Sequence, residues 1–450
     1  MKRQNLIAIG IMCGTSKDGI DMMIGETDAV APLKSLATIS LSYPAIFPFA
    51  LRAAEYRLKQ TGGDIKQVDQ NFEKYLQEFA KSNNSSKSSE KLISELNDYL
   101  GVKDSSFMNI GSLIAKYTAL CVDLIKQLQI KAKLDSSKID VIGDHGISLY
   151  HNPSKKITIQ IADGQALANA TGIFVVNNFR HNDVKNGGQG APLAPLYHQA
   201  LINSNEEYKK AWAVVNLGGT ANVTLEKDSK LIGFDTGPAN VLLDTYVRKY
   251  SRGSLTFDLD GRVALAGNVQ EDLLEKLKEF SIDYNGENYL TKIPPKSLDI
   301  SNYRLPQETE NYSFEDTCAT LAAFTSYCII AGIKLTKAQV HNIIACGGGA
   351  KNPAILHYLQ QFAKKEIGEM IRIFKASDIG IDSDYAEAEL MAFLAVKTMY
   401  KEPITFKTTT ACLSDTLGGQ GYIPKNSGAS KNATELIKGN IDLLKGYQQI

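Results

Sequence analysis

The chain has 450 residues, and its 49 Lys and Arg residues balance 49 Asp and Glu residues. A chain of this length can bury a large core and is expected to divide into two domains. Because the charges balance, the composition gives no bias toward nucleic acid or an anionic membrane, and we expect a small-molecule substrate.

The N-terminal apolar run, Leu6 to Met12, holds only seven residues. It is too short to cross a membrane, and no convincing cleavage site follows it. The six cysteines form no CxxC pair, which favours buried, reduced thiols. These features predict a cytoplasmic protein without a membrane partner.

The first predicted element is a strand, a tight turn and a second strand between Leu6 and Ile24. The turn comprises Gly14-Thr15-Ser16-Lys17-Asp18-Gly19-Ile20-Asp21. Gly lets a ligand approach the backbone closely, and hydroxyls with successive N–H groups can form a concave anion site, which suits a phosphate. An ordinary hairpin is the alternative, because Gly and Ser are common in turns. The turn matches neither a P-loop nor a dinucleotide-binding fingerprint.

Helical periodicity dominates the next part of the chain, Ala50 to Ala132, and is clearest from Phe107 to Leu128. A Ser-rich tract at residues 82–89 interrupts it and predicts an exposed loop. Short strands are then predicted at residues 139–146, 157–161 and 172–178. Strands that end in Gly, Asp, Asn and His, with helices between them, predict an α/β sheet whose strand ends carry the site.

The second half begins with another predicted strand, turn and strand, Trp212 to Thr224, with Gly218 and Gly219 in the turn. Its likeness to the first hairpin lies in pattern, which is a weak indication of a repeat. Further along, residues 343–352 predict a strand, a turn through Gly347, Gly348 and Gly349, and a helix. Three adjacent glycines would let a purine ring lie on bare backbone. A plain strand-to-helix turn is the alternative.

Several motifs follow one another in a fixed order from Ile7 to about Pro424. They are Gly14–Asp21, Asn178–Val184 with Gly187–Leu193, Asn216–Asn222, Gly233–Asn240, Pro295–Ser297, Cys346–Asn352 and Glu387-Ala388. Through them the chain resembles the 1,6-anhydro-N-acetylmuramic acid kinases, members of the actin-like ATPase and sugar kinase superfamily.

The sequence departs from that family at several positions. Cys13 stands for the usual Ser, Lys17 for Leu, Ile147-Ser148 for Gln and Thr, Asn178 for Asp, and Leu298 to Ser301 for Thr-Gly-Arg-Glu. The last three departures fall at sugar-side positions. Two alternatives therefore stay open: a related anhydrosugar kinase, such as one acting on levoglucosan, and a non-catalytic actin-like nucleotide-binding protein.

The resemblance implies an α/β fold of two actin-like, ribonuclease H-like lobes around an interdomain ATP cleft. We expect the first lobe at residues 1–204, joined by a helix at 384–400, the second lobe at 205–383, and a C-terminal extension at 401–450. The implied reaction opens the 1,6-anhydro bridge with water and phosphorylates O6 from ATP. The product would be N-acetylmuramic acid 6-phosphate, formed during peptidoglycan recycling. A homodimer is implied by the resemblance only.

The implied catalytic residues are Asp183 and Arg180. Asp183 matches the family's general base, which must deprotonate a water beside the sugar; a solvated loop acid is the alternative. Arg180 could hold a sugar oxygen or the transferring phosphoryl group as a forked cation. An ion pair that fixes the loop is its alternative.

The other implied contacts involve the Gly-rich turns and nearby polar residues. ATP is expected at Gly14, Thr15, Ser16, Lys17, Asp18, Gly19, Ile20, Asp21, Gly218, Gly219, Gly347, Gly348, Gly349 and Asn352. Substrate is expected at His145, Gly188, Gln189, Asp235, Gly237 and Asn240. Asp18, Asp235 and Glu387 are candidates to reach Mg²⁺, directly or through water. The six scattered histidines carry no zinc motif, and His145 and His151 are expected to be hydrogen-bonded turn residues.

Overall fold

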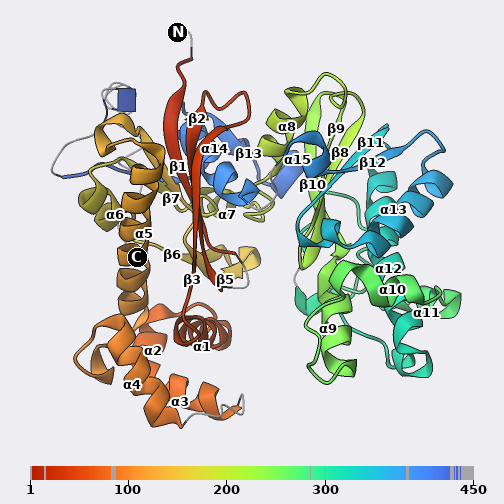
Figure 1. Cartoon of the computed structure of the whole chain (residues 1–450), viewed down its shortest axis with the longest axis horizontal. Helices are drawn as coiled ribbons and strands as arrows, with labels where there is room; N and C mark the ends of the chain where they lie inside the picture. Colours follow the sequence, from red (N-terminus) through yellow and green to blue (C-terminus); the bar gives the residue numbers. More distant parts are fainter. Residues whose placement is uncertain are drawn as a thin grey trace. The chain divides into compact units, whose positions relative to one another are not determined.

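The structure is a computed structural model, drawn in Figure 1, in which the chain forms two compact units. It describes residues 3–14, 17–82, 88–283, 285–298, 300–381, 385–425, 430, 432–433 and 436. Unit 1 comprises Met1–Gly190, Tyr385–Thr405 and Cys412–Ile450, and unit 2 comprises Ala191–Asp384 and Phe406–Ala411. The division therefore falls after Gly190, whereas the sequence placed it after residue 204.

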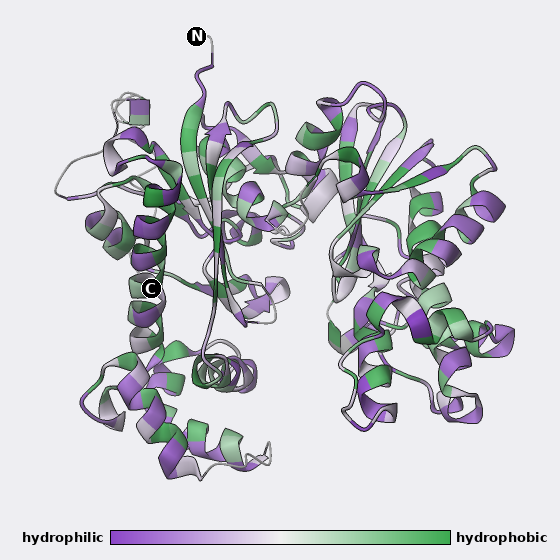
Figure 2. Cartoon of the chain, viewed as in Figure 1, coloured by the Kyte–Doolittle hydropathy of each residue, from purple (hydrophilic) through white to green (hydrophobic). Residues whose placement is uncertain are grey.

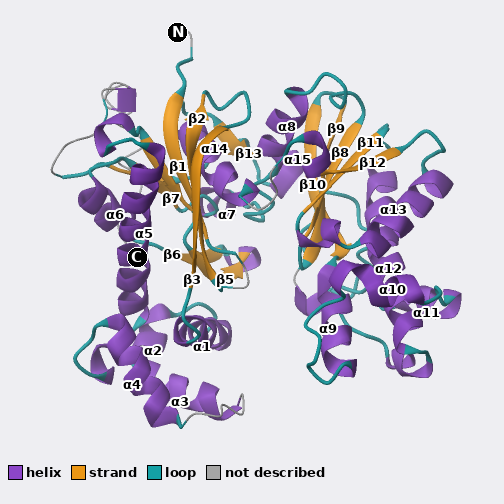
Figure 3. Ribbon diagram, in the orientation of Figure 1, coloured by secondary structure: helices purple, strands orange, loops and turns teal. Residues whose placement is uncertain are grey.

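Unit 1 is built on a six-stranded sheet in the order β15-β7-β4-β1-β2-β3 (Figure 3). The strands of unit 1, in this sheet and in two smaller ones, are β1 (Leu6–Met12), β2 (Gly19–Thr27), β3 (Lys34–Ser42), β4 (Val141–Asp144), β5 (Ile147–Asn152), β6 (Ile157–Ile161), β7 (Val175–Asn177), β13 (Pro403–Thr405), β14 (Thr416–Leu417) and β15 (Gln420–Tyr422). Pairs β5-β6 and β13-β14 form two small sheets. Strand β15 lies in the segment expected as an extension, yet it pairs with β7 as an edge strand.

The first hairpin is confirmed: β1 pairs with β2 in antiparallel register, with Met12 opposite Asp21. The turn is shorter than expected, because Gly19, Ile20 and Asp21 already belong to β2. Strands β4 and β7 run parallel to β1. The sheet therefore combines a hairpin with parallel strands, and the ends of β4 and β7 lie at the same edge.

The helices of unit 1 are α1 (Ile46–Gln60), α2 (Ile65–Asp69), α3 (Phe72–Ser82), α4 (Ser89–Leu100), α5 (Ile110–Ala132), α6 (Gly164–Thr171), α7 (His181–Lys185) and α14 (Ala386–Met399). The expected helical region is thus confirmed. The Ser-rich tract is only partly a loop: Ser82 ends α3, and Ser88 caps α4 by accepting the Lys91 N–H at 3.3 Å. Residues 83–87 lie outside the described part.

Helix α14 packs closely against β1 and β4. Gly10 and Gly143 are register partners on these strands. A Cβ at Gly10 would lie 1.7 Å from the Ala388 carbonyl oxygen, and one at Gly143 would lie 2.1 Å from that of Met391. The helix can lie on the sheet only because both side chains are absent.

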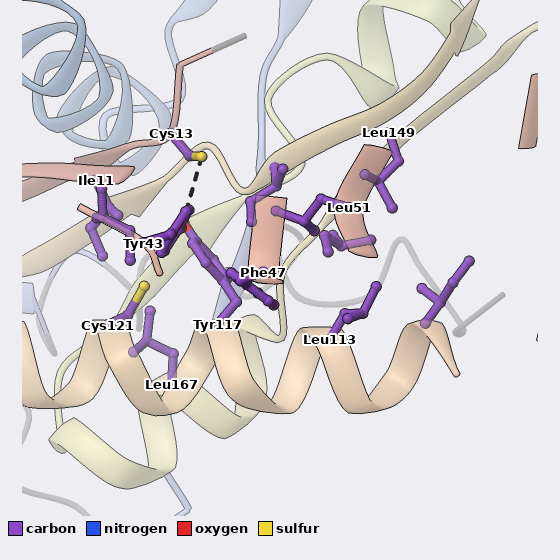
Figure 4. Packing of buried hydrophobic residues seen from close by; sticks show 14 of the residues in the cluster. Ile11, Cys13, Tyr43, Phe47, Leu51, Leu113, Tyr117, Cys121, Leu149 and Leu167 are labelled. Carbon is purple, nitrogen blue, oxygen red and sulfur yellow. Dashed lines mark hydrogen bonds between the residues drawn. The ribbon is translucent and has the colours of Figure 1, made fainter. Parts of the chain in front are cut away.

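The main core of unit 1 contains α1 and α5 (Figure 4). Helix α5 buries Leu113, Tyr117 and Cys121, which share one helical face. Tyr43 donates a hydrogen bond to the Cys13 sulfur at 3.8 Å, which Figure 4 marks with a dashed line. Burial raises the pKa of the Cys13 thiol to about 12. All six cysteines are free thiols, as the sequence predicted.

Unit 2 is built on a five-stranded sheet in the order β10-β9-β8-β11-β12. Its strands are β8 (Trp212–Leu217), β9 (Thr220–Lys227), β10 (Lys230–Pro238), β11 (Asn342–Cys346) and β12 (Arg372–Lys375). Its helices are α8 (Pro195–Asn203), α9 (Asn240–Tyr250), α10 (Arg262–Ala266), α11 (Glu271–Glu279), α12 (Phe314–Thr336), α13 (Pro353–Glu366) and α15 (Lys407–Thr410). The predicted hairpin and strand-to-helix segments are both present.

The two faces of the unit 2 sheet have separate cores. Ala213, Val215 and Leu217 of β8 join the larger core with α12, whereas Trp212 and Val214 join a smaller core with Ile202 of α8. This packing places α8 in unit 2.

Helix α12 is long and apolar enough to cross a membrane by length and composition, but most of it is buried within the unit. Figure 2 shows it among the hydrophobic segments of the chain. We therefore regard it as a core helix.

Candidate active site

Asp183 lies in the short helix α7, directly after the C-terminal end of β7. Its side chain is only 1% exposed, and its Oδ2 accepts a hydrogen bond from the Gly190 backbone N–H at 2.6 Å. The Gly188 N–H donates to the Asp183 carbonyl at 2.8 Å, which folds the following turn back over the helix. Asp183 is thus a fixed, buried carboxylate, and the alternative of a solvated loop acid is wrong.

Because Gly188 has no side chain, the Asp183 carboxylate can occupy the space beside it. A Cβ at this position would lie 2.2 Å from Asp183 Oδ2 and 2.7 Å from Oδ1. Gln189 follows, and its backbone carbonyl accepts a hydrogen bond from His151 Nε2 at 2.9 Å. Its own side-chain Oε1 is buried without a partner in the described structure. The turn therefore packs directly on Asp183.

Arg180 precedes α7 and connects two segments of unit 1. Its Nε donates to His145 Nε2 at 3.0 Å, and its Nη1 donates to the Gly190 carbonyl at 2.7 Å. The guanidinium thus contacts the same residue whose N–H binds Asp183. Arg180 and Asp183, three residues apart in sequence, meet at the Gly190 backbone.

His145 lies at the end of β4 and is 4% exposed. Its Nδ1 lies 3.0 Å from the Gly146 carbonyl. Burial and the nearby Arg180 charge lower the pKa of His145 to about 3, so its ring is neutral. As expected, His145 and His151 are hydrogen-bonded, with His151 Nδ1 at 2.9 Å from the Thr158 hydroxyl.

Asp144 is a buried carboxyl that the sequence pattern did not single out. Its Oδ1 accepts hydrogen bonds from the Tyr117 hydroxyl at 2.7 Å and from the Gly146 N–H at 2.9 Å. Burial raises its pKa to about 6. Its place at the end of β4, next to His145, was the signal that could have revealed it.

This raised pKa predicts a pH-dependent stability. The folded protein holds a proton on Asp144 up to about pH 6, whereas the unfolded chain releases it near pH 4. Asp144 therefore stabilises the fold at low pH, and that contribution is lost as pH rises through 6. We expect the free energy of unfolding of the wild type, relative to Asp144→Asn, to fall by up to about 3 kcal/mol between pH 4 and pH 7.

Urea denaturation of both proteins at several pH values in this range measures that difference. Asp123→Asn, which changes an exposed carboxylate on α5, is the matched control and should show no such trend. A pH-independent difference between wild type and Asp144→Asn would contradict the raised pKa.

In the β1–β2 turn, Lys17 is bound to other residues of unit 1. The Lys17 ammonium pairs with Glu55 of α1 at 2.9 Å, and the Lys17 backbone N–H donates to the Gly14 carbonyl at 3.0 Å. Asp18 is exposed, whereas Asp21 accepts a hydrogen bond from the Ser40 hydroxyl at 2.6 Å. Thr15 and Ser16 lie outside the described residues.

Glu387 lies in the first turn of α14 and is exposed to solvent. Partial desolvation raises its pKa, Arg180 opposes the rise, and Asp21 adds to it. These three charged groups therefore lie within electrostatic reach of one another in unit 1.

In unit 2, the two Gly turns meet at the start of α9. The N–H groups of Ala239 and Asn240 donate to the carbonyls of Gly219 and Gly218 at 2.9 and 3.0 Å. The Asn240 side chain donates to the Leu217 carbonyl at 3.2 Å. Asn240 thus joins the β8–β9 turn to the helix.

The triple-Gly turn lies beside the same residues. Gly347 has φ +80°, and a Cβ there would lie 2.4 Å from Asn216 Oδ1; one at Gly349 would lie 2.5 Å from Asn240 Oδ1. Gly348 begins a short 3₁₀ helix, and Asn352 caps α13 by accepting the Ala354 N–H at 2.9 Å. The structure therefore brings Gly218, Gly219, Asn240 and the triple-Gly turn together.

Asp235 lies on β10 at an irregularity in register before Gly237. Its Oδ2 accepts hydrogen bonds from the Leu298 N–H at 2.8 Å and the Ser297 hydroxyl at 3.3 Å. The neighbouring Lys296 is buried, which lowers its pKa to about 8, and it donates to the Tyr289 carbonyl. The Pro295–Ser297 segment is thus anchored to β10.

The residues expected from the sequence fall into two groups. Unit 1 holds Asp183, Arg180, His145, Gly188, Gln189, Glu387 and the first turn, and unit 2 holds the remainder. Within the described ranges, no group of three or more His, Cys, Asp or Glu side chains is arranged to hold a metal ion.

Comparison of the sequence with known proteins identifies one family. Residues 59–424 match the family model described as anhydro-N-acetylmuramic acid kinase. The protein of that name from Zymomonas mobilis subsp. mobilis is 32% identical over 417 residues, covering 92% of this chain and 99% of that protein. The one from Methylobacterium nodulans is 36% identical over 305 residues, covering 68% and 77%. Among solved structures, gluconate kinase from Lactobacillus acidophilus matches with a TM-score of 0.36 and 9% identity, over 98% of both chains.

Proposed function

Because this chain belongs to the anhydro-N-acetylmuramic acid kinase family, we propose that it hydrolyses and phosphorylates 1,6-anhydro-N-acetylmuramic acid with ATP. The product is N-acetylmuramic acid 6-phosphate, and the reaction serves the recycling of peptidoglycan. The observation that carries the proposal is the buried Asp183 carboxylate, held by the Gly190 N–H beside Arg180.

Asp183 is the proposed general base. Water attacks C1 of the sugar, its proton passes to Asp183, and the bond between C1 and O6 breaks. O6 then forms a bond to the γ-phosphorus of ATP, and ADP leaves. The new hydroxyl stays on C1, and Asp183 later releases the proton to solvent. A carboxylate fixed by a backbone N–H suits this role, because general-base catalysis requires a held orientation.

Arg180 is proposed to place positive charge beside the reacting groups. Its contacts with His145 and the Gly190 carbonyl hold the guanidinium close to Asp183. A cation in this position stabilises the negative charge that develops on O6 and on the phosphoryl group.

The Gly turns of unit 2 fit a nucleotide. Cβ atoms at Gly218, Gly219 and Gly348 would meet no neighbouring atom closer than 3.5 Å, so uncovered backbone lies there, whereas Gly347 and Gly349 pack against Asn216 and Asn240. Bound Mg²⁺ would neutralise charge on the ATP phosphates. Asp18 has an exposed carboxylate, which fits a contact with the ion through water, and Asp235 and Glu387 remain further candidates. The proposed cytoplasmic location rests on the short N-terminal apolar run and the cysteine pattern, and a homodimer rests on the resemblance alone.

A related anhydrosugar such as levoglucosan is the second candidate substrate. Three departures from the family pattern leave this candidate open, and each of these residues has a different contact within the protein. Asn178 lies within 3.5 Å of Gln420 Oε1 and the Tyr422 hydroxyl, and Ser148 accepts a hydrogen bond from Gln160 at 3.3 Å. The Leu298 N–H binds Asp235. None of these contacts by itself selects an N-acetyl or lactyl group.

A kinase assay over a panel of anhydrosugars tests the proposal. We expect the highest kcat/KM with 1,6-anhydro-N-acetylmuramic acid, and NMR of the product should place the phosphate on O6. The Asp183→Asn protein is the control for contaminating kinases. Faster phosphorylation of levoglucosan would select the second candidate, and binding of ATP without turnover of any sugar would favour the non-catalytic alternative.

A further inference from the structure

Both ring nitrogens of His145 already have partners within unit 1. Arg180 Nε donates to Nε2 at 3.0 Å, and Nδ1 lies 3.0 Å from the Gly146 carbonyl. A guanidinium only donates and a carbonyl only accepts, so Nε2 is the acceptor and Nδ1 carries the proton. This pattern defines one tautomer of a neutral imidazole.

The neutral state follows from the surroundings of the ring. His145 is 4% exposed and lies against a guanidinium, and these two effects lower its pKa to about 3. The ring therefore remains an acceptor for Arg180 throughout the neutral pH range. With both nitrogens bound to protein, it offers no hydrogen bond to a sugar hydroxyl.

The hydrogen bonds continue from His145 to Asp183. Arg180 Nη1 donates to the Gly190 carbonyl at 2.7 Å, and the Gly190 N–H donates to Asp183 Oδ2 at 2.6 Å. A displacement of Arg180 would therefore move the Gly190 backbone, which holds the carboxylate.

The other side of His145 is anchored in the core. Asp144 Oδ1 accepts hydrogen bonds from the Gly146 N–H and from Tyr117 of α5, and the Asp144 and Tyr117 side chains are both buried. These bonds fix the Gly146 residue whose carbonyl orients the imidazole. The hydrogen bonds therefore extend from core helix α5 to the Gly190 backbone, which binds Asp183.

We infer that His145 is a positioning residue, which holds Arg180 and, through Gly190, the Asp183 carboxylate, and which does not contact the sugar. The inference rests on the proposed function for the identity of the reacting carboxylate. It replaces the sequence-based expectation that His145 binds substrate.

Two substitutions separate the two hydrogen bonds of His145. In His145→Gln, the longer side chain reaches the position of Nε2, and its carbonyl oxygen can accept from Arg180. In His145→Asn, the amide reaches only the position of Nδ1, so it can donate to Gly146 but leaves Arg180 without this acceptor. The two side chains are otherwise alike in chemistry, so each is the control for the other.

We expect His145→Asn to lower kcat by at least about tenfold, because a misplaced catalytic group is costly, with KM for the sugar changed less than about twofold. His145→Gln should stay within about threefold of wild-type kcat. In the Asp183→Asn background, His145→Asn should cause a smaller loss than in the wild type, because the part of its effect that acts through Asp183 is already gone. An increase in sugar KM at unchanged kcat would make His145 a sugar ligand and overturn the inference.

NMR of the imidazole nitrogens tests the hydrogen bonds without any reaction. In wild-type protein labelled with ¹⁵N-histidine, the His145 signals are assigned by their loss in His145→Gln. We expect the Nδ1–H tautomer, unchanged between pH 5 and 9. The Nε2–H tautomer, or a titration in this range, would overturn the inference. If no anhydrosugar is phosphorylated by the wild type, the proposed function fails, and the tautomer still decides whether His145 holds Arg180.

Discussion

Replacing Asp183 with Asn is expected to lower kcat by roughly 10²- to 10⁴-fold, the usual contribution of a general base. The Asn carbonyl oxygen can still accept the Gly190 N–H bond, which is 2.6 Å long in the wild type, so the loop should keep its conformation. What the variant loses is the ability to accept a proton from water. Steady-state kinetics with 1,6-anhydro-N-acetylmuramic acid and ATP measure the change, and calorimetry should show ATP affinity within about twofold of wild type.

Lys185→Ala is the matched control for this variant. Lys185 is exposed on the same helix α7, two residues after Asp183. Its removal should leave kcat within about twofold of wild type, since surface changes rarely disturb a fold. Near-normal turnover of Asp183→Asn would remove Asp183 from the role of base. An equal loss in both variants would point to a general disturbance of α7.

Gly188→Ala is expected to reduce kcat by about a hundredfold, because a displacement of about 1 Å can have an effect of this size. The added Cβ would lie 2.2 Å from Asp183 Oδ2 and 2.5 Å from Cγ, so the carboxylate or the turn must shift. Asp183 is 1% exposed and has little room to move. The overpacking should also lower the free energy of unfolding by about 1–3 kcal/mol.

Kinetics and urea denaturation of Gly188→Ala measure the two effects separately. ATP affinity should stay within about twofold of wild type, because the change is confined to the turn that packs on Asp183. Adding Gly188→Ala to Asp183→Asn should lower kcat by much less than a hundredfold, since the base is already lost. Full activity of Gly188→Ala would mean that the Asp183 position is not critical for turnover.

The local elements were predictable from the sequence. The hairpins at residues 6–24 and 212–224 and the strand, triple-Gly turn and helix at 343–352 are present, because alternation and Gly-rich turns are local signals. The family was predictable as well, since the order of motifs along a chain is a property of the sequence itself. The turn after Leu6–Met12 was too long in the prediction, because β2 begins at Gly19 and strand ends depend on pairing with a neighbour.

The contacts of individual residues were harder to predict from the sequence. Lys17 pairs with Glu55 of α1, a partner that no local signal in the β1–β2 turn predicted. Asp144 was passed over, although Tyr117 and Gly146 make it a buried anchor. A residue type indicates what a side chain can do, whereas its partners depend on which elements the fold brings together.

The sequence by itself thus determined the two hairpins, the Gly turns and the family. Only the tertiary structure decided how those residues act on one another. Arg180 and His145 are 35 positions apart, and their contact exists because β4 and β7 are adjacent parallel strands whose C-terminal ends lie at one edge of the sheet. Sequence periodicity carries no information on strand order, so that contact, and the holding of Asp183 through Gly190, had to come from the fold.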